Sequence, residues 1–396
     1  MVENRELLSE KSLEMLDYFV AKDETSDFHF KTGVKPVFRE KGELYEKEFN
    51  DIHVITRNDA KEFVFDLFKL RYGADKGSKL FVDFYQKGFQ FDMAITINET
   101  KRARVNIYKS LGELCVALRQ IPSKMPDIEK IGIQNIHLNT MKEMIEGTQG
   151  LILVTGQTGS GKSTTLASFV NYINLHFKRH IITIEDPVEF QHTSKVSYVS
   201  HREVGENGDV LSFHDGLKAS LREDPDIILV GEIRDAETAL AAMQAAQTGH
   251  IVFATLHTNS VSETLTRIID LFPPEKASSI RTSLAQSFRM IISQMLIRGV
   301  DGNRFLCYEF VCNDNKVAST IISEEHTYAQ SIEDIMNSGR KEGKSETLVC
   351  NIGKRVAQGN IEYDVGKRYI NVKNYEIFDM HSGKNDSSSA FSNKNY

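Results

Sequence analysis

Strictly alternating apolar and polar positions mark the first part of the chain. Residues 89–97 alternate without a break, and residues 102–109 alternate again after a short polar segment, which predicts an antiparallel hairpin with one buried face. Residues 57–71 instead repeat apolar positions at helical spacing. We therefore expect residues 1–120 to form a small α+β domain. The predicted buried face of the first strand consists of Phe89, Phe91, Met93, Ile95 and Ile97.

The second part of the chain carries short, uninterrupted apolar runs instead. Such runs are typical of parallel strands buried on both faces, and the stretches between them are long enough for helical crossovers. Residues 133–312 are therefore expected to form an α/β domain with a mostly parallel sheet. The runs are 151–155, 181–184, 227–230 and 251–256.

Three further segments lie outside these two domains. Residues 121–132 carry Pro122 and Pro126 among charged residues, which predicts an interdomain linker. Residues 313–381 show weaker patterns and are expected to form a divergent C-terminal region. Residues 382–396 are polar and rich in serine, a composition typical of a disordered tail.

Composition narrows the class of protein. The chain has 396 residues, of which 40% are hydrophobic and 26% charged, as in soluble globular proteins. Its net charge of −7 and its lack of a basic run argue against a nucleic-acid partner. Four scattered cysteines predict neither a disulfide framework nor a zinc module. No apolar run approaches the ~18 residues that cross a bilayer, and the N-terminus is unlike a signal peptide. We expect a cytoplasmic protein whose membrane contact comes only through partners.

Residues 156–163 carry the strongest chemical signal. Their sequence, GQTGSGKS, fits the phosphate-binding pattern G-x-x-x-x-G-K-[ST], follows an apolar run and opens a helical pattern. In such a loop, glycines let backbone N–H groups surround phosphates, and the helix N-terminus adds partial positive charge. Lys162 is expected to reach the β- and γ-phosphates of ATP, and Ser163 to hold Mg²⁺. The expected nucleotide-binding residues are Gly156, Gln157, Thr158, Gly159, Ser160, Gly161, Lys162, Ser163 and Thr164.

Polar residues follow each of the other three apolar runs. Glu185, Glu232 and His257 each stand just beyond the end of a run. Ligands of open parallel sheets bind at the carboxyl ends of the strands, so these side chains meet the phosphate-binding loop if the strands are neighbours. Hydrolysis of ATP needs a metal and a carboxylate that orients water. The spacing leaves open which glutamate has which role, and His257 is a candidate sensor of the γ-phosphate.

Arginines are candidates for neutralising the charge that develops in the transition state. An isolated arginine is most often a surface charge, so the pattern alone does not select among them. The candidates are Arg202, Arg222 and Arg234 in the second domain and Arg102, Arg104 and Arg119 in the first.

Several segments together resemble a known family. They are TGQTGSGKSTTLAS, ITIEDPVEF, REVG, SLREDPDIILVGEIRDAET, TGHIVFATLHTNS and FPPEKASSIRTSLAQSFRMIISQ. They look like secretion ATPases of the type II/IV superfamily (GspE/PilT-like), and most like PilT-like pilus retraction motors, over about residues 25–312. The resemblance implies a PAS-like α+β N-terminal domain followed by a RecA-like P-loop domain. It also implies a homohexamer that uses ATP and Mg²⁺ at the cytoplasmic face of the bacterial inner membrane, beside an inner-membrane pilus or secretion platform protein.

The resemblance also implies roles for single residues. Glu185 corresponds to the catalytic glutamate, and Glu232 lies in the Walker B box near Mg²⁺. His257 belongs, with His250, to the family's His box. In the N-terminal domain, Arg104 and Arg119 match arginines that approach the nucleotide across domains or subunits.

The expected function is that of a hexameric motor ATPase that drives type IV pilus retraction or twitching motility. Two alternatives stay open: an ATPase of a type IVB secretion or conjugation apparatus, and a nucleotide-binding ring scaffold that does not hydrolyse ATP. The tetracysteine zinc module of the larger export ATPases is missing, and the resemblance fades after about residue 313. A DNA translocase is disfavoured because the chain has no basic run.

Overall fold

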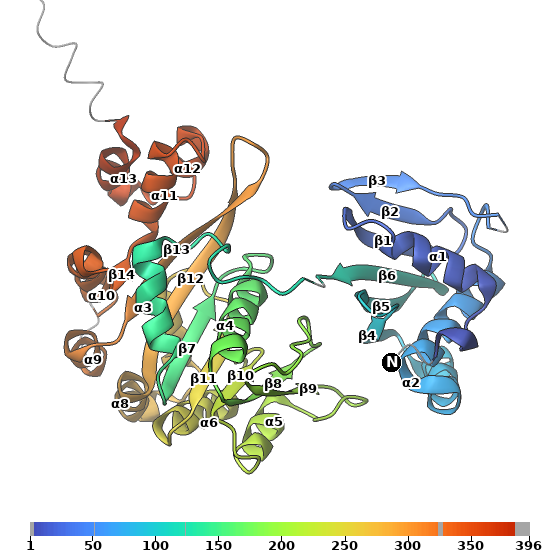
Figure 1. The fold of residues 1–396 in the computed structure, drawn as a ribbon, viewed down its shortest axis with the longest axis horizontal. Helices are drawn as coiled ribbons and strands as arrows, with labels where there is room; N and C mark the ends of the chain where they lie inside the picture. Colours follow the sequence, from blue (N-terminus) through green and yellow to red (C-terminus); the bar gives the residue numbers. More distant parts are fainter. Residues whose placement is uncertain (1–3, 51, 123, 324–327, 385–396) are drawn as a thin grey trace, which may run out of the picture. The chain divides into compact units, whose positions relative to one another are not determined.

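The computed structural model of the protein describes residues 4–50, 52–122, 124–323 and 328–384 (Figure 1). These residues form two compact units. The first unit runs to Lys124 and includes Pro187–Phe190, and the second contains the other residues from Met125 onward. The domain limits expected from the sequence stay predictions, although Ile121, expected in the linker, is the last residue of a strand.

The first unit is an antiparallel sheet with helices on one face. The sheet has the order β3-β2-β1-β6-β5-β4, and the helices α1 (Glu10–Val20) and α2 (Arg57–Lys87) share one apolar core with it. Its strands are β1 (Thr25–Lys31), β2 (Val37–Glu40), β3 (Glu43–Glu46), β4 (Gln90–Thr96), β5 (Arg102–Ser110) and β6 (Glu113–Ile121).

The predicted hairpin and helix are both present in this unit. β4 pairs antiparallel with β5, and α2 covers the predicted helical segment, but the helical stretch extends to Lys87 with a kink at Gly73, whose φ of 78° is not helical. The prediction for Phe89 was wrong, because this residue precedes β4 and its side chain is 86% exposed. The chain is still leaving the end of α2 at Gly88, so the strand begins one residue later than the alternation suggests.

The second unit contains the predicted parallel sheet. Its strand order is β14-β13-β12-β7-β11-β10-β8-β9, and the six strands from β12 to β9 run parallel. The four apolar runs correspond to the adjacent central strands β7, β11, β10 and β8, which confirms the sheet prediction. The strands are β7 (Gly150–Thr155), β8 (His180–Glu185), β9 (Tyr198–Glu203), β10 (Ile227–Val230), β11 (Ile251–Leu256), β12 (Phe288–Arg298), β13 (Arg304–Cys312) and β14 (Ser345–Glu346).

Helices cover both faces of this sheet. In β7, Leu151 and Leu153 belong to the apolar core beneath α5 to α8, whereas Ile152 and Val154 belong to the core beneath α3 and α4. Burial on both faces explains why the strand is apolar at successive positions. The helices are α3 (Asn135–Ile145), α4 (Lys162–His176), α5 (Phe213–Ser220), α6 (Ala236–Gln247), α7 (Val261–Asp270) and α8 (Ala277–Ser287).

The segment after β13 is helical and packs on the same unit. Several of its helices bury apolar residues against the C-terminal end of β12, at Ile297, and the N-terminal half of β13, at Cys307. The predicted tail, residues 382–396, lies outside the described residues from 385 onward, and Ser382 ends the last helix. The helices are α9 (Asn315–Ile322), α10 (Tyr328–Gly339), α11 (Leu348–Ala357), α12 (Tyr363–Lys367) and α13 (Tyr375–Ser382).

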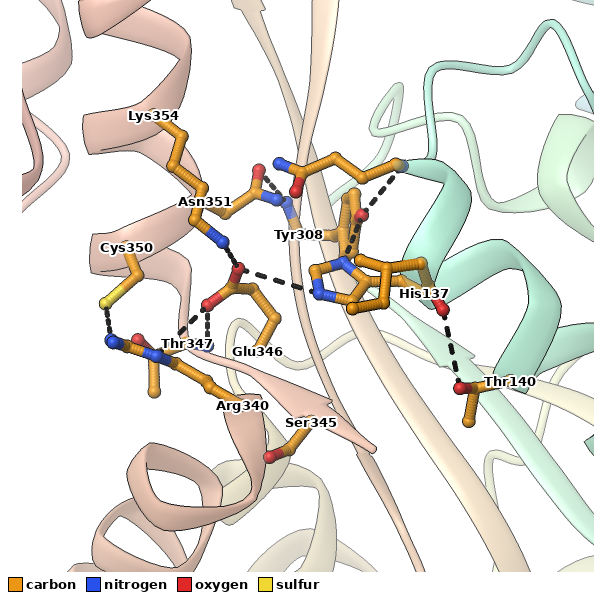
Figure 2. Close-up of polar contacts among 12 residues, drawn as sticks. His137, Thr140, Tyr308, Arg340, Ser345, Glu346, Thr347, Cys350, Asn351 and Lys354 are labelled. Atoms are coloured by element: carbon orange, nitrogen blue, oxygen red, sulfur yellow. Dashed lines mark hydrogen bonds and ion pairs between the residues drawn. The ribbon is translucent and has the colours of Figure 1, made fainter. Parts of the chain in front are cut away.

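A buried ionic cluster joins this helical segment to α3 (Figure 2). Glu346, which is completely buried, pairs with Lys354 and lies 3.9 Å from Arg340 Nε and 3.8 Å from His137 Nε2. His137 Nδ1 is 2.8 Å from the hydroxyl of Tyr308. Burial lowers the pKa of His137 to about 4, so Lys354 and Arg340 supply the positive charge at neutral pH. The cluster connects α3, β13, β14 and α11 through side chains that are far apart in the sequence.

Candidate nucleotide-binding site

Four neighbouring strands bring the predicted site residues to one edge of the sheet. The parallel register pairs Thr155 with Leu256 and sets Val230 opposite both Ala254 and Ile184, so the carboxyl ends of the strands lie side by side. The phosphate-binding loop follows β7, His257 follows β11, Glu232 lies two residues beyond β10, and Glu185 ends β8. The expectation that these strands are neighbours is confirmed.

The phosphate-binding loop is tightly packed at its first glycine. Gly156 has a φ of 145°, and a Cβ there would overlap the carbonyl oxygen of Gln294 and lie 2.5 Å from Ser160 Oγ. At the other end, Gly161 has a φ of 90° and caps α4, which begins at Lys162. Side chains are disfavoured at both positions, so the glycines permit the close turn that leads into the helix.

The loop presents polar groups of the kind that bind phosphate. Lys162 Nζ donates hydrogen bonds to the carbonyl oxygens of Gly156, at 2.7 Å, and Gln157, at 3.2 Å, which holds the ammonium over the loop. Ser160 Oγ is buried and has no hydrogen-bond partner among the described residues. A buried hydroxyl without a partner is costly, and a phosphate oxygen is the type of acceptor that would satisfy it. Ser163 and Thr164 lie in the first turn of α4.

Gln294 supports this loop from β12 and was missed by the sequence reasoning. Its side chain is 3% exposed, its Nε2 donates to the carbonyl oxygen of Ser160 at 2.8 Å, and its Oε1 accepts from Thr165 Oγ1 at 2.9 Å. One amide therefore fixes the loop and the first turn of α4 together. The available signal was an amide within the largely apolar segment MIISQML.

Glu232 and His257 lie together, beside Arg234. His257 Nε2 is 3.4 Å from Glu232 Oε1, and Arg234 Nε donates to Glu232 Oε2 at 2.8 Å. The Arg234 hydrogen bond, with His257 beside the other carboxylate oxygen, fixes the orientation of the group. An oriented carboxylate of this kind is suited to a metal shell or to a water molecule.

Glu185 lies beside a pair of histidines that the sequence reasoning did not select. His201 Nδ1 is 3.9 Å from Glu185 Oε1 and 2.8 Å from Thr183 Oγ1, while the backbone N–H of His192 donates to His201 Nε2 at 2.9 Å. Because Nε2 accepts this bond, the network assigns the ring proton to Nδ1, on the side of Glu185. Burial, together with the proximity of His201, lowers the pKa of His192 to about 3, so His192 is neutral at physiological pH.

Two predicted residues of the first unit form a like-charged pair. Arg104 on β5 lies directly opposite Arg119 on β6. Arg119 Nε donates to Asp27 Oδ1 at 2.7 Å. Burial would raise the pKa of Asp27, but hydrogen bonds from Ser26 and Arg119 outweigh it and hold this pKa below its usual value. Both arginines belong to the first unit, whereas the phosphate-binding loop belongs to the second.

Two other candidates have positions or partners that do not point to the phosphate-binding loop. His250 precedes β11, so it lies at the opposite end of that strand from His257, where its Nδ1 is 3.0 Å from the carbonyl oxygen of Ala245. Arg202 forms an ion pair with Glu223 at 2.6 Å.

Comparison with known proteins identifies the family. The family described as "Type II/IV secretion system protein" matches residues 87–368. The chain belongs to this family. Among curated relatives, the type IV pilus retraction ATPase PilT of Pseudomonas aeruginosa is 38% identical over 321 residues, which cover 81% of this chain and 88% of that protein. The twitching motility protein of Neisseria gonorrhoeae is also 38% identical, over 72% of this chain and 74% of its own length.

Solved structures of family proteins are similar to this one. The crystal structure of the pilus retraction motor PilT with bound ADP has a TM-score of 0.79 and 35% identity, covering 92% of this chain and 98% of that chain. The Legionella pneumophila ATPase DotB has a TM-score of 0.74 and 26% identity, covering 90% and 93%. The predicted fold class is confirmed: an α+β N-terminal domain followed by a RecA-like domain with a mostly parallel sheet.

The family match also corrects one expectation. The resemblance was expected to fade after residue 312, but the match continues to residue 368 and includes helices of the C-terminal segment. Within the residues that the structure describes, no helix is both long and apolar enough to cross a bilayer.

Proposed function

We propose that this type II/IV secretion family protein is a homohexameric motor that hydrolyses ATP to drive type IV pilus retraction or twitching motility. The observation that carries this proposal is the common edge of the sheet, where a glycine-rich loop, two glutamates and a histidine follow four adjacent strands. The names of the relatives support the choice of filament, because PilT of Pseudomonas aeruginosa is a pilus retraction ATPase and the Neisseria gonorrhoeae relative is a twitching motility protein.

The residues present fit ATP and Mg²⁺. The close turn at Gly156, the unpartnered hydroxyl of Ser160 and the ammonium of Lys162 provide a cradle for phosphates. The nucleotide would contact Gly156 to Thr164, and Ser163, with Glu232 nearby, would hold Mg²⁺. When bound, Mg²⁺ neutralises charge on the phosphates.

The acidic residues and His257 have distinct proposed roles in hydrolysis. In line with the family resemblance, we assign Glu185 to the orientation of the attacking water; His201, which lies 3.9 Å from Glu185 Oε1 through its Nδ1, is held beside this carboxylate by Thr183. Glu232 is assigned to the metal shell. His257, which contacts Glu232, can donate a hydrogen bond to the γ-phosphate. The presence or absence of that phosphate would then affect the position of the loop after β11.

Arg104 and Arg119 are proposed to complete the site from the N-terminal domain. Two like charges directly opposite each other on neighbouring strands are unfavourable without an anion. Asp27 bonds Arg119, whereas the Arg104 side chain is exposed. A phosphate-bound nucleotide offers the missing negative charge, which would make closure of the domains depend on ATP.

The proposed setting is the cytoplasmic face of the inner membrane, in contact with a pilus or secretion platform protein and without nucleic acid. The main alternative is an ATPase of a type IVB secretion or conjugation apparatus. A ring scaffold that binds nucleotide without hydrolysis is the second alternative.

Replacement of the native gene by a Lys162→Ala variant in the host tests this proposal. A retraction motor predicts normal surface pili and loss of twitching motility, with unchanged levels of the protein. Normal twitching together with loss of secretion or conjugation would support the type IVB alternative, and no change in any of these would contradict an ATP-driven role.

A further inference from the structure

Three buried threonine hydroxyls lie between the phosphate-binding loop and the loop that carries His257. Thr155 ends β7 immediately before Gly156, and Thr258 immediately follows His257. Thr264, near the start of α7, has its Oγ1 2.7 Å from Thr258 Oγ1 and 3.3 Å from Thr155 Oγ1. Because all three side chains are buried, their hydroxyls must find partners within the protein.

The available donors and acceptors determine which of the three threonine hydroxyls donates and which accepts. Thr264 Oγ1 lies 2.7 Å from the carbonyl oxygen of Ser260, which can only accept, so the single hydroxyl proton of Thr264 is used there. Two lone pairs remain on Thr264 Oγ1, and the hydroxyls of Thr258 and Thr155 can donate to them. The alternative acceptor for Thr155, the carbonyl oxygen of Ile292, is farther away, at 3.5 Å. One oxygen atom therefore accepts from both loops.

We propose that Thr264 is a positioning residue that fixes His257 relative to the phosphate-binding loop. The inference rests on the proposed role of His257 at the γ-phosphate. Backbone pairing between β7 and β11 ends with Thr155 opposite Leu256, just before the two loops begin. The Thr264 hydroxyl extends this connection to Thr258, beyond the last backbone pair, and so it links the loop after β11 to the end of β7.

The two hydrogen bonds to Thr264 differ in length, and this difference suggests how the group acts. The 2.7 Å bond from Thr258 is of normal length for two hydroxyls, whereas 3.3 Å to Thr155 is long. Hydrogen bonds at catalytic sites are often long without substrate and shorten in the complex. Thr264 therefore holds the His257 loop firmly and contacts the phosphate-binding loop loosely.

Removal of the Thr264 hydroxyl should slow hydrolysis more than it weakens nucleotide binding. The backbone cradle, Lys162 and Ser163 are untouched, so affinity for ADP should stay within about 2-fold of the wild-type value. His257 would lose its fixed position, and a displacement of about 1 Å at a reacting group can cost on the order of 100-fold in rate. We expect kcat of the Thr264→Val variant to fall ~10- to 100-fold.

The experiment compares this variant with two matched substitutions. Thr264→Ser keeps the hydroxyl and should retain kcat within a few fold. Thr266→Val removes a hydroxyl from the same helix that makes the same kind of bond, to the carbonyl oxygen of Ser262 at 3.0 Å, and should leave kcat unchanged. ADP-binding stoichiometry gives the fraction of folded protein in each sample. Equal kcat for Thr264→Val and wild type, or equal losses for Thr264→Val and Thr266→Val, would overturn the proposal.

A double-mutant cycle with His257→Ala separates positioning from general packing. If Thr264 acts through His257, the double variant should be no slower than His257→Ala alone. Multiplied losses would mean that Thr264 acts independently, which contradicts the inference. If His257→Ala itself keeps the wild-type kcat, the proposed role of His257 fails instead, so the two failures are distinguishable.

Discussion

Replacement of Gln294 by leucine would measure how far one buried amide shapes the phosphate-binding loop. The amide bonds the carbonyl oxygen of Ser160 at 2.8 Å and the hydroxyl of Thr165 at 2.9 Å, and leucine has a similar size but neither polar group. At about 1 kcal/mol for each lost hydrogen bond, the ordered form of the loop loses ~2 kcal/mol. This corresponds to about 30-fold in the equilibrium between ordered and disordered loop.

The assay is the KM for ATP together with the Kd for ADP. Both should rise by up to ~30-fold in Gln294→Leu, because apparent affinity falls in proportion to the fraction of competent loop. We expect kcat to change less, since the catalytic candidates on the other strands are untouched. Gln247→Leu is the control, because it removes an amide that bonds Ser283 near the opposite end of the strands, at 3.1 Å. Wild-type KM and Kd in folded Gln294→Leu would refute this reasoning.

Three further predictions concern the glutamates, the N-terminal arginines and the buried cluster. Glu232→Gln should raise the Mg²⁺ concentration needed for turnover, whereas Glu185→Gln should slow turnover with nearly normal Mg²⁺ dependence; the opposite pattern would reverse our assignment. Arg104→Ala and Arg119→Ala should each retain ATP binding, measured by titration, and lose most turnover, since the loop is intact but transition-state charge is not neutralised. Glu346→Gln should lower the free energy of unfolding by about 1–3 kcal/mol in urea titrations, because the amide cannot replace the charged contacts that the buried carboxylate makes with the partly exposed side chains of Lys354 and Arg340.

Matched variants serve as controls for the predictions on the N-terminal arginines and on Glu346. Arg57→Ala removes an exposed arginine that pairs with Glu113 in the same unit as Arg104, and it should leave turnover unchanged. Glu342→Gln removes the exposed partner of Lys344, at 2.9 Å, and should change the free energy of unfolding by less than ~1 kcal/mol. Equal effects of Glu342→Gln and Glu346→Gln would contradict the importance given to burial.

The sequence predicted those elements that are determined by residues close together in the chain. Strands β7, β8, β10 and β11 could be found because burial on both faces leaves no polar position in the run other than at most a single threonine, and the glycine loop has a fixed spacing. The common edge followed from the rule that parallel strands present their carboxyl ends together. Phe89 was misplaced because the alternation extends by chance to the residue before β4. At that position the chain has only just left the C-cap of α2.

The supporting contacts could not be predicted because they join residues that are far apart in the chain. Gln294 reaches Ser160 only because β12 lies beside β7, an adjacency that the pattern of apolar runs does not determine. His201 meets Glu185 because β9 extends the sheet beyond β8. The contact between Glu346 and His137 has the same origin, since α3 and β14 are far apart in the chain. Only Gln294 left a local sign, as an amide within a largely apolar strand.

Steady-state phosphate release from the purified full chain tests the central claim most directly. With ATP and Mg²⁺, the wild-type protein should release phosphate continuously, and Lys162→Ala should reduce the rate at least ~100-fold while its circular dichroism spectrum stays unchanged. The lysine lies in the loop rather than in an apolar core, so its loss should remove phosphate binding and not the fold. Equal rates for the two proteins would contradict the assignment of the loop, and tight ATP binding without phosphate release by the wild type would contradict the motor in favour of a scaffold.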